Sequence, residues 1–342
     1  MAVVSPFRAL RYTGAAGPPA DLVAPPYDVI DDDARSAYLA RSPFNVVHLT
    51  LPDSPEAAAE LLALWRDAGI LQEEEPALWW LAQEFVGPDG IARTREGIAG
   101  SIEVSPYSAG EVLPHELTHA GPKEGRLRLL RATRTQLEPI FLIYDDDPAG
   151  SRPAGDPELE VDESGVRTRL WRLGGDPIEL DVPLLIADGH HRYETAIAFR
   201  EEEPSATHTF AVLVSSRSPG VEIFPTHRIV QQVGVEPDGA ATPGWQHDAL
   251  AMYRGGSYFR LDAADDLDAR QVQRYEPEGV EYTPYADRAV AVVDAGGADR
   301  AFLVRPPTIE QVYSVAAAGE TMPQKSTFFY PKLTSGLLFH PV

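Results

Sequence analysis

The feature that most constrains the fold is the run ADGHHRYETA at residues 187–196. It follows an apolar segment, residues 183–187, and leads into a helical pattern that runs towards Phe199. This order predicts a strand, a tight glycine turn and a helix. The turn places an acid, two histidines and an arginine where the N–H groups of a helix N-terminus point outward, a position that attracts phosphate or carboxylate. We therefore expect an anion site at this turn.

A structural alternative exists for the same residues. An Asp-Gly step can be a simple turn and helix cap, and histidines near helix ends are often structural. That alternative leaves unexplained why His190, His191 and Arg192 follow Asp188 directly at the end of a buried strand. Ligands of α/β proteins usually bind at the carboxyl ends of strands. We favour the functional interpretation.

Composition excludes several classes of function. The net charge of −23 opposes binding to a nucleic-acid backbone, and the absence of cysteine removes disulfides, thiolate catalysis and thiolate metal sites. No apolar run approaches the roughly 20 residues of a membrane span. The first residues lack the basic and apolar regions of a secretory signal. We expect a cytoplasmic protein that binds neither membranes nor nucleic acids.

Apolar patterning predicts strands and helices mixed along the chain, hence an α/β fold with a mixed sheet, with an α+β arrangement as the alternative. Strands are predicted at 140–144, 183–187, 210–214 and 223–230, and helices at 53–69, from 188 towards 199, and at 309–316. Hairpins are predicted for 78–86 with 91–104, and for 289–294 with 301–305.

Composition along the chain suggests four regions. Residues 148–165 are rich in Pro, Gly, Asp and Ser and are expected to form a surface loop or soft boundary. An N-terminal α/β region, 1–147, precedes it. A strand-turn-helix core, 166–235, carries the ADGHHR turn, and a C-terminal α/β region, 236–342, follows.

Residues 115–119, HELTH, match the HExxH pattern of zinc proteases. Pro114 before the motif and Gly121-Pro122 after it leave too little room for the helix that the zinc site requires. We reject a protease and keep a metal site as a minor alternative. The same stretch through residue 134 is either a charged helix start or a loop that brings Glu116 and Lys123 towards a phosphate.

Residues 319–326 approach the pattern of a phosphate-binding P-loop but have Gln324 where the loop needs a second glycine. We reject a P-loop, although Lys325, Ser326 and Thr327 remain candidates for binding an anion. Near the N-terminus, two prolines present Tyr27 and Asp28 from a rigid turn. On this segment alone a stiff connection is the better interpretation.

Taken together, VAPPYDVI, NVVHLTLP, HELTHAGPKE, ADGHHRYETA, PTHRIV and MPQKSTFFYPKLTSGL resemble, in this order, a prokaryotic family filed as domain of unknown function one-zero-one-five. The resemblance covers nearly the whole chain. Gly125 departs from the family pattern, in which an acid is expected. The ADGHHR segment is also similar to the phosphate-binding turn of the ParB/sulfiredoxin-like fold, and its DGHHR spelling is most similar to free serine kinases. A sulfiredoxin reaction is excluded because it needs a cysteine.

This resemblance implies a ParB/sulfiredoxin-like core and a nucleotide-dependent transfer of phosphate to a small hydroxyl acceptor, with free serine as the most specific guess. ATP or ADP with Mg²⁺ would be the cofactor. Gly189, His191 and Arg192 would hold the phosphates, and Asp188 would bind Mg²⁺ or orient the acceptor. Further candidates are Glu116 as general base, His190 as a catalytic group, Lys123 and Lys325 as neutralising cations, and Ser326 and Thr327 as phosphate ligands.

Two alternatives remain open. The same pocket in a non-catalytic protein would make it a nucleotide-binding regulator. A metal-dependent hydrolase would use histidines from His115, His119, His190 and His191.

Overall fold

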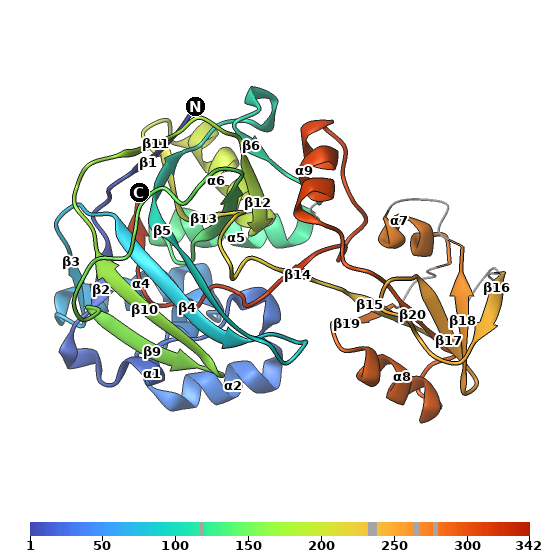
Figure 1. The fold of residues 1–342 in the computed structure, drawn as a ribbon. Coiled ribbons are helices and arrows are strands. Elements are labelled where there is room, and N and C mark those ends of the chain that lie inside the picture. The colour runs from blue at the N-terminus through green and yellow to red at the C-terminus, as the bar shows by residue number, and fades with distance from the viewer. Residues whose placement is uncertain (117–119, 232–237, 263–266, 276–279) are drawn as a thin grey trace. The chain divides into compact units, whose positions relative to one another are not determined.

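A computed structural model describes residues 1–116, 120–231, 238–262, 267–275 and 280–342 (Figure 1). The chain divides into two compact units. The first unit comprises Met1–Pro114, Thr118–Val221 and Pro331–Val342, and the second comprises His115–Leu117 and Glu222–Tyr330. The second unit is thus inserted before the last segment of the first.

The first unit is built on a mixed sheet. Within the described residues its strands are β1 (Ala2–Ser5), β4 (Trp79–Val86), β5 (Ala92–Glu103), β6 (Val112–Leu113), β8 (Ile140–Tyr144), β9 (Leu159–Glu163), β10 (Val166–Arg172), β11 (Ile178–Leu180), β12 (Leu184–Asp188) and β13 (His208–Ser215). The order is β6-β12-β8-β13-β5-β4-β10-β9, and β1 pairs with β5 and β11. β12 is parallel to β6, β13 is parallel to β8, and the other pairs are antiparallel.

Helices and short ladders complete the first unit. The helices are α1 (Pro19–Leu22), α2 (Asp32–Arg41), α3 (Val47–Thr50), α4 (Pro55–Asp67), α5 (Ala120–Thr133) and α6 (His190–Glu202). Three short 3-10 turns are η1 (Gly14–Ala16), η2 (Tyr27–Val29) and η3 (Tyr107–Ala109). Two small ladders pair β2 (Leu10–Tyr12) with β3 (Leu71–Glu73) and β7 (Thr135–Gln136) with β22 (His340–Pro341). Ser54 caps α4 by accepting a hydrogen bond from Ala57 N, and Pro55 occupies the first helical position.

The core positions the β12–α6 junction. Leu184, Leu185 and Ile186 of β12 are fully buried in the sheet. Tyr193, in the first turns of α6, is also fully buried, and its hydroxyl donates to Ser105 O at 2.9 Å. Because strand and helix are both anchored this way, the turn between them is held rigidly.

The second unit has its own antiparallel sheet of order β16-β18-β17-β20-β15-β19. Its described elements are β14 (Ile223–Phe224), β15 (His227–Val230), β16 (Gly239–Thr242), β17 (Ala251–Arg254), β18 (Ser257–Leu261), α7 (Asp268–Gln273), β19 (Glu281–Thr283), α8 (Ala286–Asp294), β20 (Arg300–Leu303), α9 (Ile309–Ala317) and β21 (Phe328–Phe329). α8 packs on the sheet through Ala289 and Val293, and β14 pairs with β21.

The predicted mixed α/β class is confirmed, as are the strands at 140–144, 183–187 and 210–214, the 78–104 hairpin and the helices at 53–69, after 188 and at 309–316. The hairpin predicted for 289–305 is wrong, because 286–294 form helix α8 and only β20 is a strand. The strand predicted for 223–230 is divided in two around Pro225, which lacks the N–H that a ladder needs. Strand β9 lies within 148–165 and pairs with β10.

No helix among the described residues combines the length and apolar character needed to cross a membrane.

Candidate functional site

The turn between β12 and α6 depends on glycine. Gly189 has φ of +96°, in the left-handed region that side chains disfavour. A Cβ atom placed on Gly189 would lie 3.0–3.1 Å from the guanidinium of Arg192, which folds back over this turn. The first bond of the helix runs from Tyr193 N to Gly189 O at 3.0 Å. The amides of residues 190–192 therefore precede the helical hydrogen-bond ladder.

Asp188 is held by two cations. Its Oδ2 accepts a 2.5 Å hydrogen bond from Arg192 Nη2, and its Oδ1 accepts one from Lys332 Nζ. Arg192 also donates from Nη1 to Pro139 O. The side chains of Asp188 and Arg192 are each only 11% exposed, so these contacts are screened little by water.

These charges control the titration of the cluster. Burial raises the pKa of Asp188, but the charges of Lys332 and Arg192 outweigh burial and leave that pKa well below its usual range. Burial lowers the pKa of Lys332, and the charge of Asp188 more than reverses this, so the pKa is raised. Asp188, Arg192 and Lys332 are therefore all charged at neutral pH.

A third cation, Arg95, interacts through its charge with Asp188. It is 1% exposed and donates from Nη2 to Gln83 Oε1 at 2.5 Å and to Pro331 O at 2.7 Å. Burial lowers the pKa of Arg95 to about 9, and the charge of Asp188 acts in the opposite direction. Arg95 thus adds positive charge and fixes the backbone that leads into Lys332.

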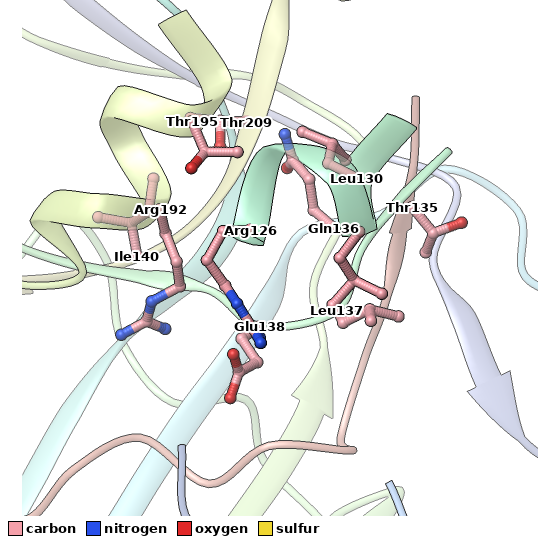
Figure 2. A pocket seen from close by; sticks show the side chains of 11 residues that line it. Arg126, Leu130, Thr135, Gln136, Leu137, Glu138, Ile140, Arg192, Thr195 and Thr209 are labelled. Carbon is pink, nitrogen blue, oxygen red and sulfur yellow. The ribbon is translucent and has the colours of Figure 1, made fainter. Parts of the chain in front are cut away.

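A pocket adjoins Arg192 beneath α5 and α6. Its lining residues are Arg126, Leu129, Leu130, Thr135, Gln136, Leu137, Glu138, Ile140, Arg192, Thr195 and Thr209. In Figure 2 the charged ends of Arg126, Arg192 and Glu138 gather at one end of this pocket. The cavity volume of about 60 Å³ holds a few water molecules and is too small for a nucleobase.

The charges around the turn leave a small positive surplus. Four cations, Arg95, Arg126, Arg192 and Lys332, face three carboxylates, Asp28, Asp188 and Glu138, among the described residues that act on one another here. The helix N-terminus adds further positive potential. In a chain of net charge −23, this is a local site that favours anions.

The remaining predicted residues of the first unit lie around this turn. His190 is buried, and its charge contributes to the low pKa of Asp188. His191 is half-buried, and its carbonyl accepts a hydrogen bond from Thr195. Lys123 of α5 forms an ion pair with Glu194 of α6 at 3.4 Å. Lys123 therefore contacts the helix that carries the turn.

The HELTH and QKST segments meet in the second unit. His115 Nε2 lies 2.8 Å from Thr327 Oγ1, and Thr327 Oγ1 donates to Glu116 Oε1 at 3.4 Å. Both bonds form together when the His115 ring donates from Nε2 to Thr327. Glu116 also pairs in a parallel bridge with Met322. This arrangement joins an imidazole, a hydroxyl and a carboxylate.

The neighbours of Thr327 differ in their surroundings. Ser326 is buried, and its hydroxyl donates to Pro323 O at 2.5 Å. Lys325 is exposed and has φ of +55°. His119 and Thr118 lie outside the described residues. Among the described residues no three His, Asp or Glu side chains gather as a metal site requires.

Sequence reasoning missed Lys332, Arg95 and Glu138. Lys332 lies in the segment MPQKSTFFYPKLTSGL, which carries part of the family resemblance, but nothing in the local sequence indicates that this lysine pairs with Asp188. Arg95 and Glu138 carry no local signal, because only the folded chain brings them to Asp188 and Arg192.

Several solved structures of other proteins are similar to this chain. Similar solved structures include a free serine kinase in complex with AMP, with 17% identity, 68% of this chain and 86% of that chain covered, and a TM-score of 0.41. Another is a conserved hypothetical protein from Pyrococcus furiosus, with 17% identity, coverages of 68% and 90%, and a TM-score of 0.37. SbnI with C-terminal truncation from Staphylococcus aureus has 14% identity, coverages of 71% and 81%, and a TM-score of 0.41.

Among curated protein sequences none matches this chain. The model of a protein family does match, over residues 4–241, which is more than half of the chain. The match confirms the family resemblance for the motifs from VAPPYDVI to PTHRIV, and MPQKSTFFYPKLTSGL lies beyond the matched residues. The chain belongs to the family described as "Protein of unknown function (DUF1015)".

Proposed function

We propose that the β12–α6 turn binds the phosphates of a nucleotide, ATP or ADP, and that the protein transfers a phosphoryl group to a small hydroxyl acceptor. Free serine is the acceptor that the resemblance of the DGHHR turn favours. The observation that carries the proposal is the cation surplus at the N-terminus of α6, a helix of 13 residues. Such a helix end with adjacent guanidinium and ammonium groups is complementary to phosphate.

The residues of the turn have donors left for a ligand. Arg192 has five N–H groups, and its two bonds, to Asp188 and Pro139 O, leave three for phosphate oxygens. His191 is the second proposed phosphate ligand, with the backbone at Gly189 allowing close approach. Lys123, Lys325, Ser326 and Thr327 remain proposed contributors to charge neutralisation and phosphate binding.

In the proposed reaction the acceptor oxygen forms a bond to the terminal phosphorus of the nucleotide. The bond from that phosphorus to the leaving oxygen breaks, and the shortened nucleotide departs with the electron pair. The proton of the acceptor hydroxyl passes to a base. Glu116, whose carboxylate accepts a hydrogen bond from Thr327 within the second unit, remains the proposed candidate for this role. His190 would act on Asp188 by its charge.

Asp188 does not fit a magnesium ligand as the chain holds it. Arg192 and Lys332 already contact the two oxygens of Asp188, and their positive charges neutralise this carboxylate and repel a divalent cation. We derive no step through magnesium. Asp188 instead serves as a positioning residue that holds Arg192 and Lys332 at the turn.

The test is ³¹P NMR of ATP or ADP incubated with the protein and L-serine, with and without Mg²⁺. The proposal predicts a phosphoserine signal that appears as the terminal phosphate signal of the nucleotide decays. Other hydroxy compounds are tested in the same way. If a nucleotide raises the melting temperature of the protein but is never consumed, the protein is a nucleotide-binding regulator and not an enzyme. A ligand present at a hundred times its dissociation constant raises the free energy of unfolding by about 2.7 kcal/mol, which a melting-temperature measurement detects. No shift with any nucleotide would overturn the proposal.

A further inference from the structure

Glu138 is a buried carboxylate with an uneven set of partners. The residue is 7% exposed, and its Oε1 accepts hydrogen bonds from Tyr27 N at 3.0 Å and Ser335 Oγ at 2.8 Å. In the described part of the chain Oε2 accepts no hydrogen bond from protein. Two segments, η2 and the C-terminal segment, therefore bond to one oxygen of this residue of the β7–β8 connection, and Glu138 also lines the small cavity.

The charges that face Glu138 come from both helices. Arg126 of α5 and Arg192 of α6 are the cations that act on it, and the phenol of Tyr27 lies on the η2 side. Arg126 is itself held by Thr50 O, to which Nη1 donates at 2.8 Å, and by the Tyr27 ring, 4.0 Å from its guanidinium carbon. Burial raises the pKa of Tyr27, so the phenol is neutral at physiological pH.

Three carboxylates therefore act on Arg192. Asp188 bonds it directly, and Glu138 and Asp28 act on it through their charge. An anion that binds at the turn is attracted by Arg192 and is repelled by these carboxylates. Lys332 holds Asp188 ionised, whereas no lysine in the described part of the chain acts on Glu138. Burial raises the pKa of Glu138, and the opposing charges of Arg192 and Arg126 do not offset this effect. Of Glu138 and Asp188, only Glu138 has a raised pKa, so a new negative charge nearby protonates Glu138 the more readily.

We propose that Glu138 is a positioning residue that couples anion binding to proton uptake: its carboxylate, which lines the same cavity as Arg126 and Arg192, balances their charge while no anion is bound and takes a proton from solvent when a polyphosphate binds beside Arg192. This inference rests on the proposed function, since it assumes an anion at the β12–α6 turn. The cavity supplies room for the water that carries the proton. No bond other than the O–H bond of Glu138 is formed.

The test uses calorimetric titration of the full chain with inorganic pyrophosphate between pH 5 and 8.5. The variant Glu138→Gln keeps an oxygen to accept from Tyr27 N and Ser335 Oγ but cannot be charged. We expect wild type and Glu138→Gln to bind equally at low pH, and wild type to bind about tenfold more weakly at high pH, which corresponds to a shift of one pKa unit on binding. Comparison of the two proteins cancels the titration of pyrophosphate and of the histidines.

A matched control is Glu163→Gln, which neutralises another buried carboxylate of the first unit, one that accepts from Tyr38 and pairs with Arg41. Its pH profile should coincide with that of wild type. A second variant, Ser335→Ala, removes a hydrogen bond that lowers the pKa of Glu138, so the pH at which wild-type affinity falls should move upward.

The outcomes separate the two proposals. If pyrophosphate binds to wild type and Glu138→Gln with the same pH profile, the coupling is wrong while the anion site stands. If neither protein binds pyrophosphate or a nucleotide, the proposed function itself fails. If Glu138→Gln does not fold, an upward shift in Ser335→Ala still supports the coupling, and an unchanged profile in that variant overturns it.

Discussion

Lys332 Nζ donates to Asp188 Oδ1 across 144 residues of sequence, and both residues belong to the first unit. Lys332 is the second residue after the chain returns from the second unit. Arg95 holds the preceding carbonyl, that of Pro331, at 2.7 Å. The anion site is therefore completed only when the last segment of the chain has folded back onto β12.

Replacing Lys332 with methionine should lower the free energy of unfolding of the first unit by about 2 kcal/mol, less than the roughly 3–5 kcal/mol for breaking a fully buried ion pair, because the Lys332 side chain is 21% exposed. Urea denaturation followed by tryptophan fluorescence measures this, because four of the five tryptophans lie in the first unit. Lys332→Arg keeps the charge and should lose less. A Lys332→Met protein as stable as wild type would refute the pairing.

The double variant Asp188→Asn/Lys332→Met should lose less stability than the sum of the two single variants. Each single change leaves a buried charge without its main partner, and the double change removes both charges together. A double-mutant cycle in urea gives the coupling free energy. Strict additivity would show that the two side chains do not interact in solution.

Gly189→Ala should destabilise the first unit by about 1–3 kcal/mol, because the backbone is left-handed and the new Cβ would meet the Arg192 guanidinium at 3.0 Å. Thermal or urea unfolding measures the loss. The matched control is Gly125→Ala in α5, where nothing lies within 4 Å of the added atom and the change should stabilise by up to about 1 kcal/mol. Equal effects of the two changes would contradict the turn geometry.

Glu116→Gln should lower turnover about 10²- to 10⁴-fold if Glu116 is the base, with little change in nucleotide affinity. Thr327→Val should lower turnover less, because it removes only the hydroxyl that orients Glu116. Initial rates and nucleotide binding, measured separately, distinguish the steps. A Glu116→Gln enzyme with wild-type turnover would remove Glu116 from the reaction.

The buried ring of His340 should make the first unit sensitive to acid. Burial, followed by the charge of His208, lowers the pKa of His340 to about 4. The unfolded chain, with a histidine pKa near 6.5, then binds more protons than the folded chain between about pH 6.5 and 4. Stability is full above pH 6.5 and falls as pH decreases through this window, by about 3 kcal/mol for this group.

The measurement for His340 is urea unfolding at several pH values for wild type and His340→Asn. Asparagine retains a donor for Gln136 Oε1, which lies 3.2 Å from the His340 Nδ1 atom, but does not titrate. The variant should lose the part of the pH dependence that lies between pH 6.5 and 4. Parallel profiles for the two proteins would exclude His340 as a source of acid sensitivity.

Local patterns predicted the parts of this structure that local physics determines. The β12–α6 turn was found because a strand, a glycine with positive φ and a helix follow one another in ten residues. Helix α8 was mistaken for a strand because its valines favour strands, whereas Ala289 and Val293, four residues apart, are its buried face. The helical spacing of the buried residues was present in the sequence, but the strand preference of the valines led to the wrong prediction.

The partners of the turn could not be predicted in the same way. Lys332 reaches Asp188 only through the return of the chain from an inserted unit, and Glu138 reaches Arg192 only through the packing of α5 and α6 on the sheet. The convergence of His115, Glu116 and Thr327 was likewise invisible, since the segments are about two hundred residues apart. Charge pairing over such distances leaves no local trace in a single sequence.

The central claim is that the N-terminus of α6 binds phosphate, and one NMR titration tests it most directly. Selective ¹⁵N-histidine labelling yields amide signals from only nine residues, of which His190 and His191 begin the helix. Their signals are assigned with His190→Gln and His191→Gln. Pyrophosphate should move these two signals in a saturable way while most others stay in place. Signals of His190 and His191 that do not move at saturating pyrophosphate would contradict the account.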